Sequence, residues 1–215
     1  APSMTLSIDA RAKEMKAAGL NVIGFGAGEP DFPTPQHICD AAKEAIDLGM
    51  TRYTPAAGTK ELRKAICEKL RRDNDMTCTY GDILVSNGAK HSLFNIFQAI
   101  LDPGDEVLIP TPCWVSYPEL VRMAGGVPVF IPATEETNFI PTNKDIASRV
   151  TRRTKAIVIT SPSNPNGSVW EQEQLQFVAD LAVSHPFFVV SDEIYEKLVY
   201  DSCEHVSIAS LGEKI

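Results

Sequence analysis

The sequence predicts an α/β fold, in which a mostly parallel sheet is flanked by helices and preceded by an N-terminal arm. From about residue 80 onward, short apolar runs alternate with longer amphipathic segments, as expected for alternating strands and helices. The short runs are apolar on both faces, which is typical of parallel strands buried on both sides. With 215 residues, the chain is long enough for one sizeable domain, or for one domain with an appendage.

Residues 1–79 have a different pattern from the rest of the chain. A polar, partly helical arm is followed by a Gly/Pro-rich loop at residues 25–32. Helices are expected at about residues 35–48 and 59–73, and residues 49–58 separate them. We interpret this region as an arm and a pair of helices that pack outside the sheet.

The remaining elements are expected to alternate. A helix is expected at residues 89–101, where Asp102-Pro-Gly104 provides a stop signal, and another at residues 170–184. The apolar runs between the amphipathic segments predict five strands, at residues 83–85, 106–109, 127–131, 156–160 and 187–191.

The composition disfavours several classes of function. Lys and Arg total 20 against 28 Asp and Glu, so the net charge of −8 disfavours binding to nucleic acid or to anionic membranes. No apolar stretch has the length of a membrane span, and the N-terminus lacks the apolar core of a signal peptide. The five cysteines form no C-x-x-C pair, so we expect no metal site, no disulfides and a cytoplasmic location.

Ligands of parallel sheets bind beyond the carboxyl ends of the strands, which directs attention to the strand ends. In residues 86–90, Gly88 allows a tight turn and a helix follows. The free N–H groups at the start of that helix could hold a phosphate. An ordinary turn between a strand and a helix is the alternative interpretation of the same residues.

Asp192, Trp114 and Tyr195 also lie at strand ends. A buried carboxylate at Asp192 needs a cation or strong donors, such as a protonated ring nitrogen, unless it caps a following helix. Trp114 could stack on a flat ligand, whereas Trp170, at a helix start, is interpreted as a packing residue. A ligand with a phosphate, a flat ring, a basic ring nitrogen and a polar ring substituent fits these residues, and pyridoxal 5′-phosphate has all four features.

Six motifs, in order along nearly the whole chain, resemble class I/II aminotransferases, and most of all the bacterial aspartate aminotransferase branch. The resemblance implies a fold-type I enzyme that depends on pyridoxal 5′-phosphate. It implies an incomplete large domain at residues 49–215, preceded by the arm and part of a small domain at residues 1–48. The motifs are GAGEPDF (26–32), TRYTPAAG (51–58), SNGAKHSLFN (86–95), LDPGDEVLIPTPCWVSYPE (101–119), SPSNPNGSV (161–169) and SDEIYEKLVYD (191–201).

The resemblance implies roles for individual residues at the cofactor. The backbone N–H groups that follow Gly88, those of Ala89 and Lys90, would hold the phosphate, and the Lys90 side chain would face solvent. The Trp114 ring would stack on the pyridine ring. Asp192 would pair with the protonated ring nitrogen.

Other residues would contact the ring oxygen, the substrate and a second subunit. Asn164 and Tyr195 would form hydrogen bonds with the phenolic oxygen of the cofactor. Gly28 would bind the substrate α-carboxylate through its backbone, and Trp114 and Asn164 would also border the substrate. Tyr53 would reach the phosphate of a neighbouring subunit, which implies a homodimer.

The resemblance also implies cis peptide bonds at Thr111–Pro112 and Asn164–Pro165. Two residues depart from the family's pattern: Asn166 stands where a threonine is usual, and Cys113 stands where a tyrosine is usual. Neither difference removes a proposed cofactor contact.

The lysine that binds the cofactor as a Schiff base is expected after Ile215, because no lysine of this chain lies in the family's Ser-Lys context. The chain alone is therefore expected to be inactive. The full-length enzyme would transfer an amino group from an L-amino acid, aspartate or glutamate, to a 2-oxo acid. The alternatives are aromatic, alanine or prephenate-type substrates, a C–S lyase, and, from another class, a non-catalytic binding module.

Overall fold

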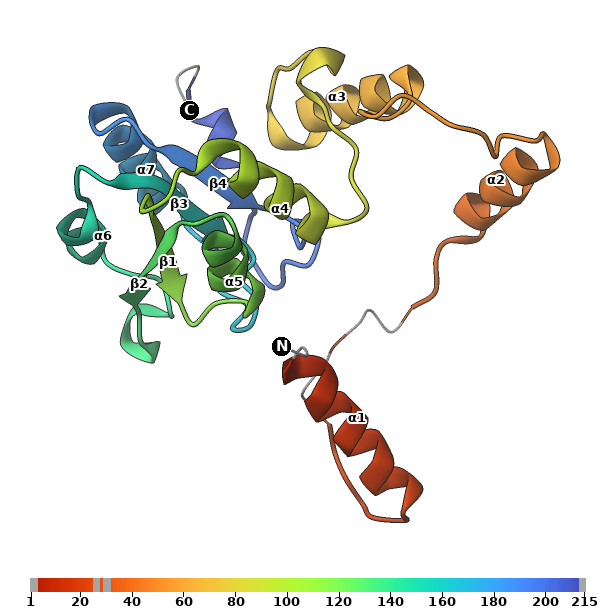
Figure 1. The fold of residues 1–215 in the computed structure, drawn as a ribbon, viewed down its shortest axis with the longest axis horizontal. Helices are drawn as coiled ribbons and strands as arrows, with labels where there is room; N and C mark the ends of the chain where they lie inside the picture. The colour runs from red at the N-terminus through yellow and green to blue at the C-terminus, as the bar shows by residue number, and fades with distance from the viewer. Residues whose placement is uncertain (1–3, 25–27, 29–31, 213–215) are drawn as a thin grey trace. The chain divides into compact units, whose positions relative to one another are not determined.

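The computed structural model describes residues 4–24, 28 and 32–212, and the chain divides into two units, residues 1–53 and 54–215 (Figure 1). In the first unit, α1 (Met4–Ala17) confirms a helix in the arm, and α2 (Gln36–Asp47) confirms the helix expected at residues 35–48. No residue of α2 is buried. Most of the predicted Gly/Pro-rich loop lies outside the described residues.

Among the described residues, the second unit contains a four-stranded parallel sheet, which confirms the predicted α/β fold. The strand order is β2-β1-β3-β4, and Thr160 at the end of β3 is the register partner of Asp192 at the end of β4. The ends of β3 and β4 therefore lie side by side. Asp192 is at the end of β4, and Asn164 follows shortly after the end of β3. The strands are β1 (Glu106–Thr111), β2 (Val127–Pro132), β3 (Thr154–Thr160) and β4 (Phe188–Asp192).

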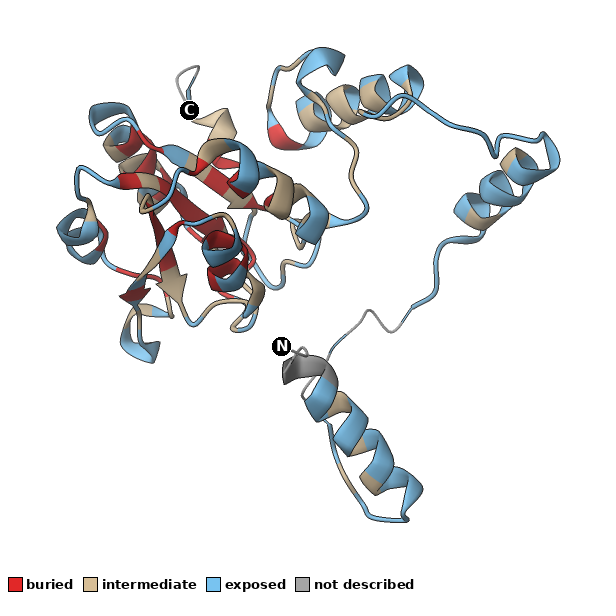
Figure 2. Cartoon of the chain, viewed as in Figure 1, coloured by how far each residue is buried: buried red, intermediate tan, exposed pale blue. Residues whose placement is uncertain are grey.

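Helices cover both faces of this sheet, because successive strand side chains point to opposite faces. On one face, Leu108 and Ile157 share a core with α6 and α7, and on the other, Val107 and Val158 share a core with α4 and α5. Figure 2 shows that buried residues gather along the strands of the sheet. The helices are α3 (Lys60–Asn74), α4 (Ala89–Ile100), α5 (Ser116–Met123), α6 (Asn143–Arg149) and α7 (Gln172–Ser184), with short 3₁₀ turns at Tyr80–Asp82, Glu135–Thr137 and Ile208–Ser210.

The strand expected at residues 83–85 does not form, so this prediction was wrong. Leu84 is 56% exposed, and Val85 N–H donates to Ala57 O over 3.0 Å. A strand requires a ladder of hydrogen bonds to a neighbouring strand. In the described part of the chain, no neighbouring strand supplies that ladder.

The sequence did not predict α5 and α6, which have 8 and 7 residues. Helices of this length contain too few apolar residues to show a clear 3.6-residue period. A capping box at Thr142 starts α6, because its hydroxyl accepts from Asp145 N–H over 3.2 Å. The start of α7 is Gln172 rather than residue 170, and Trp170 is buried in the core, which confirms its packing role.

Two expectations drawn from composition can be compared with the structure. All five cysteines are free thiols in the structure. The longest described helix, α3, has 15 residues, and no helix in the described ranges is long and apolar enough to cross a membrane.

Candidate active site

The turn before α4 has the geometry of an anion site. Gly88 has a φ of 83°, which favours glycine, and a Cβ there would meet no atom within 4 Å. Within the described ranges, the backbone N–H groups of Ala89 and Lys90 donate to no other residue. These groups and the positive end of the α4 dipole suit the predicted phosphate. His91 supports the turn, because its Nδ1 accepts from Asn87 N–H over 3.1 Å.

Trp114 lies next to this turn. The Lys90 ammonium is 4.8 Å from the centroid of the Trp114 ring, and the Lys90 residue is exposed. The Tyr117 ring meets the Trp114 ring edge-on, with centroids 5.4 Å apart and an interplanar angle of 84°. The structure therefore brings a cation and an aromatic ring together beside the phosphate turn, an arrangement that suits a flat, anionic ligand.

Asp192 is a buried carboxylate at the end of β4, with 9% of the residue exposed. The Tyr117 hydroxyl donates to Oδ2 over 2.7 Å, and Ile194 N–H donates to Oδ1 over 3.3 Å. No cationic side chain of the described residues forms an ion pair with it. No helix begins at Asp192, so the alternative of a helix N-cap is wrong. A buried carboxylate with donors but no cation suits a cationic ligand atom.

Tyr117 was not predicted as a site residue. It is 1% exposed, and its hydroxyl lies 2.7 Å from Thr160 Oγ1 as well as contacting Asp192. Burial, and next the charge of Asp192, raise the pKa of Tyr117 above its ordinary value, so the hydroxyl stays protonated. One feature of the sequence indicates that Tyr117 is buried, because Tyr117, Leu120 and Val121 have the spacing of one helix face. A buried tyrosine usually needs a hydrogen-bond partner.

The loop after β3 is fixed by hydrogen bonds around Asn164. Ser163 N–H donates to Ser168 O and Gly167 N–H donates to Ser163 O, each over 2.8 Å. Asn166, the departure from the family's pattern, accepts from Ser168 N–H through Oδ1 over 2.9 Å, which forms an Asx turn. The half-buried Asn164 amide forms no hydrogen bond with the described residues, so it is available to a ligand.

The peptide bonds at Thr111–Pro112 and Asn164–Pro165 are cis, which confirms the prediction, and the bond at Ser161–Pro162 is cis as well. The other departure from the pattern, Cys113, is half-buried, and burial raises the pKa of its thiol. The thiol is therefore protonated at neutral pH and adds no charge to the site.

Three other predicted residues are Tyr195, Gly28 and Tyr53, and no side-chain hydrogen bond or ring contact of the described residues links Tyr195 to this cluster. Tyr195 is half-buried and follows β4 in the same segment as Asp192. Gly28 and Tyr53 belong to the first unit, where both are exposed. Their roles therefore stay predictions.

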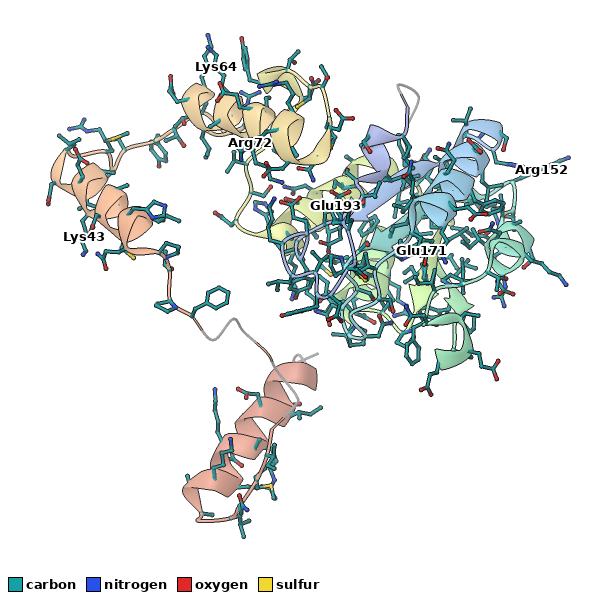
Figure 3. All side chains as sticks on the ribbon, turned by 180° about the vertical axis from the view of Figure 1, so that it is seen from behind. Lys43, Lys64, Arg72, Arg152, Glu171 and Glu193 are labelled. Carbon is teal, nitrogen blue, oxygen red and sulfur yellow. The ribbon has the colours of Figure 1, made fainter. Side chains whose placement is uncertain are left out.

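The groups at this site fit pyridoxal 5′-phosphate. They are free N–H groups for a phosphate, an aromatic ring, a carboxylate without a cation and a free amide. Figure 3 shows the side chains of the described residues, and it labels Glu193, which directly follows Asp192. A phosphate, a flat ring and a protonated ring nitrogen are the complements of this set.

Comparison with known proteins identifies the family. Residues 21–215 match the family described as aminotransferase class I and II. The chain belongs to this family, whose members depend on pyridoxal 5′-phosphate. Its described α/β architecture is that of the fold-type I members.

Individual relatives are similar along the whole chain. An aspartate aminotransferase of Bacillus sp. (strain YM-2) is 53% identical over 214 residues, and a probable aspartate/prephenate aminotransferase of Aquifex aeolicus (strain VF5) is 51% identical over 214 residues. Both alignments cover 100% of this chain, but 55% and 54% of the relatives. The structure of aspartate aminotransferase from Thermus thermophilus with maleate matches with a TM-score of 0.95 at 48% identity, over 98% of this chain and 55% of that chain. The chain thus spans about half the length of these relatives.

Proposed function

We propose that the intact protein is an aminotransferase that moves an amino group from aspartate or glutamate to a 2-oxo acid. The observation that carries this proposal is the buried Asp192 carboxylate, which has two hydrogen-bond donors and no cationic partner among the described residues. Pyridoxal 5′-phosphate, when bound, supplies the electron sink that amino-group transfer requires. The negative charge of Asp192 keeps a proton on the ring nitrogen, because an opposite charge favours the protonated form.

The other residues of the chain bind and orient the cofactor in this proposal. The Ala89 and Lys90 N–H groups bind the phosphate, and Trp114 covers one face of the ring. The amide of Asn164 and the hydroxyl of Tyr195 bind the phenolic oxygen. No lysine of this chain lies in the family's Ser-Lys context, so none is assigned here as the lysine that anchors the cofactor and moves the proton.

The substrate preference is proposed from the names of the relatives. One is named an aspartate aminotransferase and another a probable aspartate/prephenate aminotransferase, and aspartate is common to both names. We therefore favour aspartate as amino donor, with prephenate as a second acceptor. These names favour amino-group transfer over C–S cleavage or binding without catalysis.

Assembly, domain limits and location are also part of the proposal. A homodimer would place Gly28 and the partner subunit's Tyr53 at each site, with Gly28 on the substrate carboxylate. Residues 1–48 would form the arm and part of the small domain, and residues 49–215 the large domain. The five free cysteines fit a cytoplasmic location, because thiols persist in reducing compartments.

Replacement of Asp192 tests the proposed function in the full-length protein. Asp192→Ala should lower turnover with aspartate and 2-oxoglutarate about 100-fold or more, because it removes the charge opposite the ring nitrogen. Asp180→Ala, which removes an exposed carboxylate from α7, should leave turnover unchanged. Steady-state assays across aspartate, aromatic amino acids, alanine and prephenate would rank the substrates. Full turnover in Asp192→Ala, or no turnover with any amino donor, would contradict the proposal.

A further inference from the structure

The Tyr117 hydroxyl joins three elements at the candidate site. It comes from α5, lies 2.7 Å from Thr160 Oγ1 at the end of β3, and donates over 2.7 Å to Asp192 Oδ2 at the end of β4. Thr160 and Asp192 are register partners on neighbouring strands. Because Tyr117 is 1% exposed, water competes little for these hydrogen bonds.

The directions of the hydrogen bonds follow from the carboxylate at one end. An ionised carboxylate only accepts, so the single hydroxyl proton of Tyr117 points to Asp192. The Tyr117 oxygen then accepts a hydrogen bond from the hydroxyl of Thr160. The bonds run from Thr160 to Tyr117 to Asp192, and each bond in such a chain strengthens the next.

We propose that Tyr117 is a positioning residue that holds the Asp192 carboxylate in the orientation that meets the ring nitrogen of the cofactor. This inference rests on the proposed function. Tyr117 holds Oδ2 and Ile194 N–H holds Oδ1, so the carboxylate cannot rotate without losing a hydrogen bond. The ring of Tyr117 also contacts Trp114 edge-on, so one side chain orients both the acid and the aromatic ring.

Two ligands can separate this role from a general effect on stability. Pyridoxamine 5′-phosphate binds without a covalent bond to lysine, so its affinity measures non-covalent contacts. Its 1-deaza analogue has a C–H group in place of the ring nitrogen and offers Asp192 no cation. Tyr117→Phe should weaken binding of pyridoxamine 5′-phosphate about tenfold or more, because hydrogen bonds to charged groups are the stronger ones. It should leave the affinity for the analogue nearly unchanged.

The measurement is calorimetric titration of the full-length protein freed of cofactor. Tyr200→Phe, which removes the hydroxyl of an exposed tyrosine, is the matched control and should change neither affinity. Thr160→Val removes the donor to Tyr117 and should cause a smaller loss of the same kind. It is also the second variant if thermal melting shows that Tyr117→Phe does not fold.

A double variant tests whether Tyr117 acts through Asp192. In an Asp192→Asn background, Tyr117→Phe should cause no further loss of affinity for pyridoxamine 5′-phosphate. Equal losses for both ligands, or additive losses in the double variant, would overturn the inference. If Asp192→Asn weakens binding and Tyr117→Phe does not, this inference alone is wrong. If Asp192→Asn has no effect, or the wild-type protein does not bind the ligand, the proposed function fails and the inference fails with it.

Discussion

The Asp73 carboxylate, near the end of α3, lies between two cations. Arg72 Nε donates to Oδ1 over 2.7 Å, and Lys197 Nζ lies 3.1 Å from Oδ2. The hydrogen bond from Arg72, and next that from Lys197, lower the pKa of Asp73 to about 2. Arg72 projects from α3 (Figure 3) and Lys197 follows β4, so the Asp73 carboxylate is one of the groups that link the helix to the segment after the sheet.

Asp73→Asn should therefore lower stability in a pH-dependent way. The folded pKa lies below the ordinary aspartate value of about 3.9, so the stabilisation is fully present above that pH and is lost as the pH falls toward 2. Urea unfolding of the full-length protein between about pH 7 and pH 3 should show a wild-type advantage that narrows below about pH 4. About 1 M NaCl should reduce the advantage at neutral pH. An advantage that is independent of pH would contradict this assignment.

Residues of the candidate site differ in how well the sequence predicts them. Trp114 and Asp192 could be predicted because each lies at the end of an apolar run that forms a strand, and the ends of parallel strands meet at one edge. Gly88 could be predicted from its turn before a helix, although the run that precedes it forms no strand. For Tyr117 the sequence could indicate burial but not its contacts, since its partners Thr160 and Asp192 are 43 and 75 residues away in the chain. These partners come together only when the sheet forms.

At the scale of elements, the segment at residues 83–85 forms no strand ladder with the described strands, and Val85 instead lies close to the backbone of Gly58. A Cβ at Gly58 would lie 2.6 Å from Val85 Cγ2, and Gly58 has a φ of 95°. Val85 N–H donates to Ala57 O at the same place. The apolar residues of this segment predicted a strand, but local sequence cannot show whether a neighbouring strand exists to pair with it.

Gly58→Ala should therefore destabilise the full-length protein by about 2 kcal/mol or more, because it combines an unfavourable φ with a steric clash. Gly104→Ala is the matched control. Gly104 has a φ of 91° but nothing within 4 Å of its Cβ position, so the loss there should be about 1 kcal/mol. Free energies of unfolding from chemical denaturation would compare the two variants. Equal losses would show that the approach of Val85 adds no cost.

For the whole molecule, the sequence predicts the layers of the fold. It does not predict which exposed apolar side chains are covered by other parts of the protein or by a second subunit. Alternating strands and helices specify a parallel sheet between helices, because each unit is local in sequence. The exposed side chains Ile38 and Ile46 of α2, and Phe188 of β4, give no such signal. Whether they are covered in the full-length protein depends on residues far away in sequence or in a second subunit.

The proposed homodimer makes a prediction for mixed subunits. If each site combines Asp192 of one subunit with Tyr53 of the partner subunit, full-length Asp192→Ala and Tyr53→Ala homodimers both have two defective sites. A mixed dimer has one site with both substitutions and one site with neither. Refolding the two variants together in equal amounts should restore about a quarter of wild-type turnover at low cofactor concentration, since about half of random dimers are mixed. A site built within one subunit would give no restoration, because each subunit would keep its own defect.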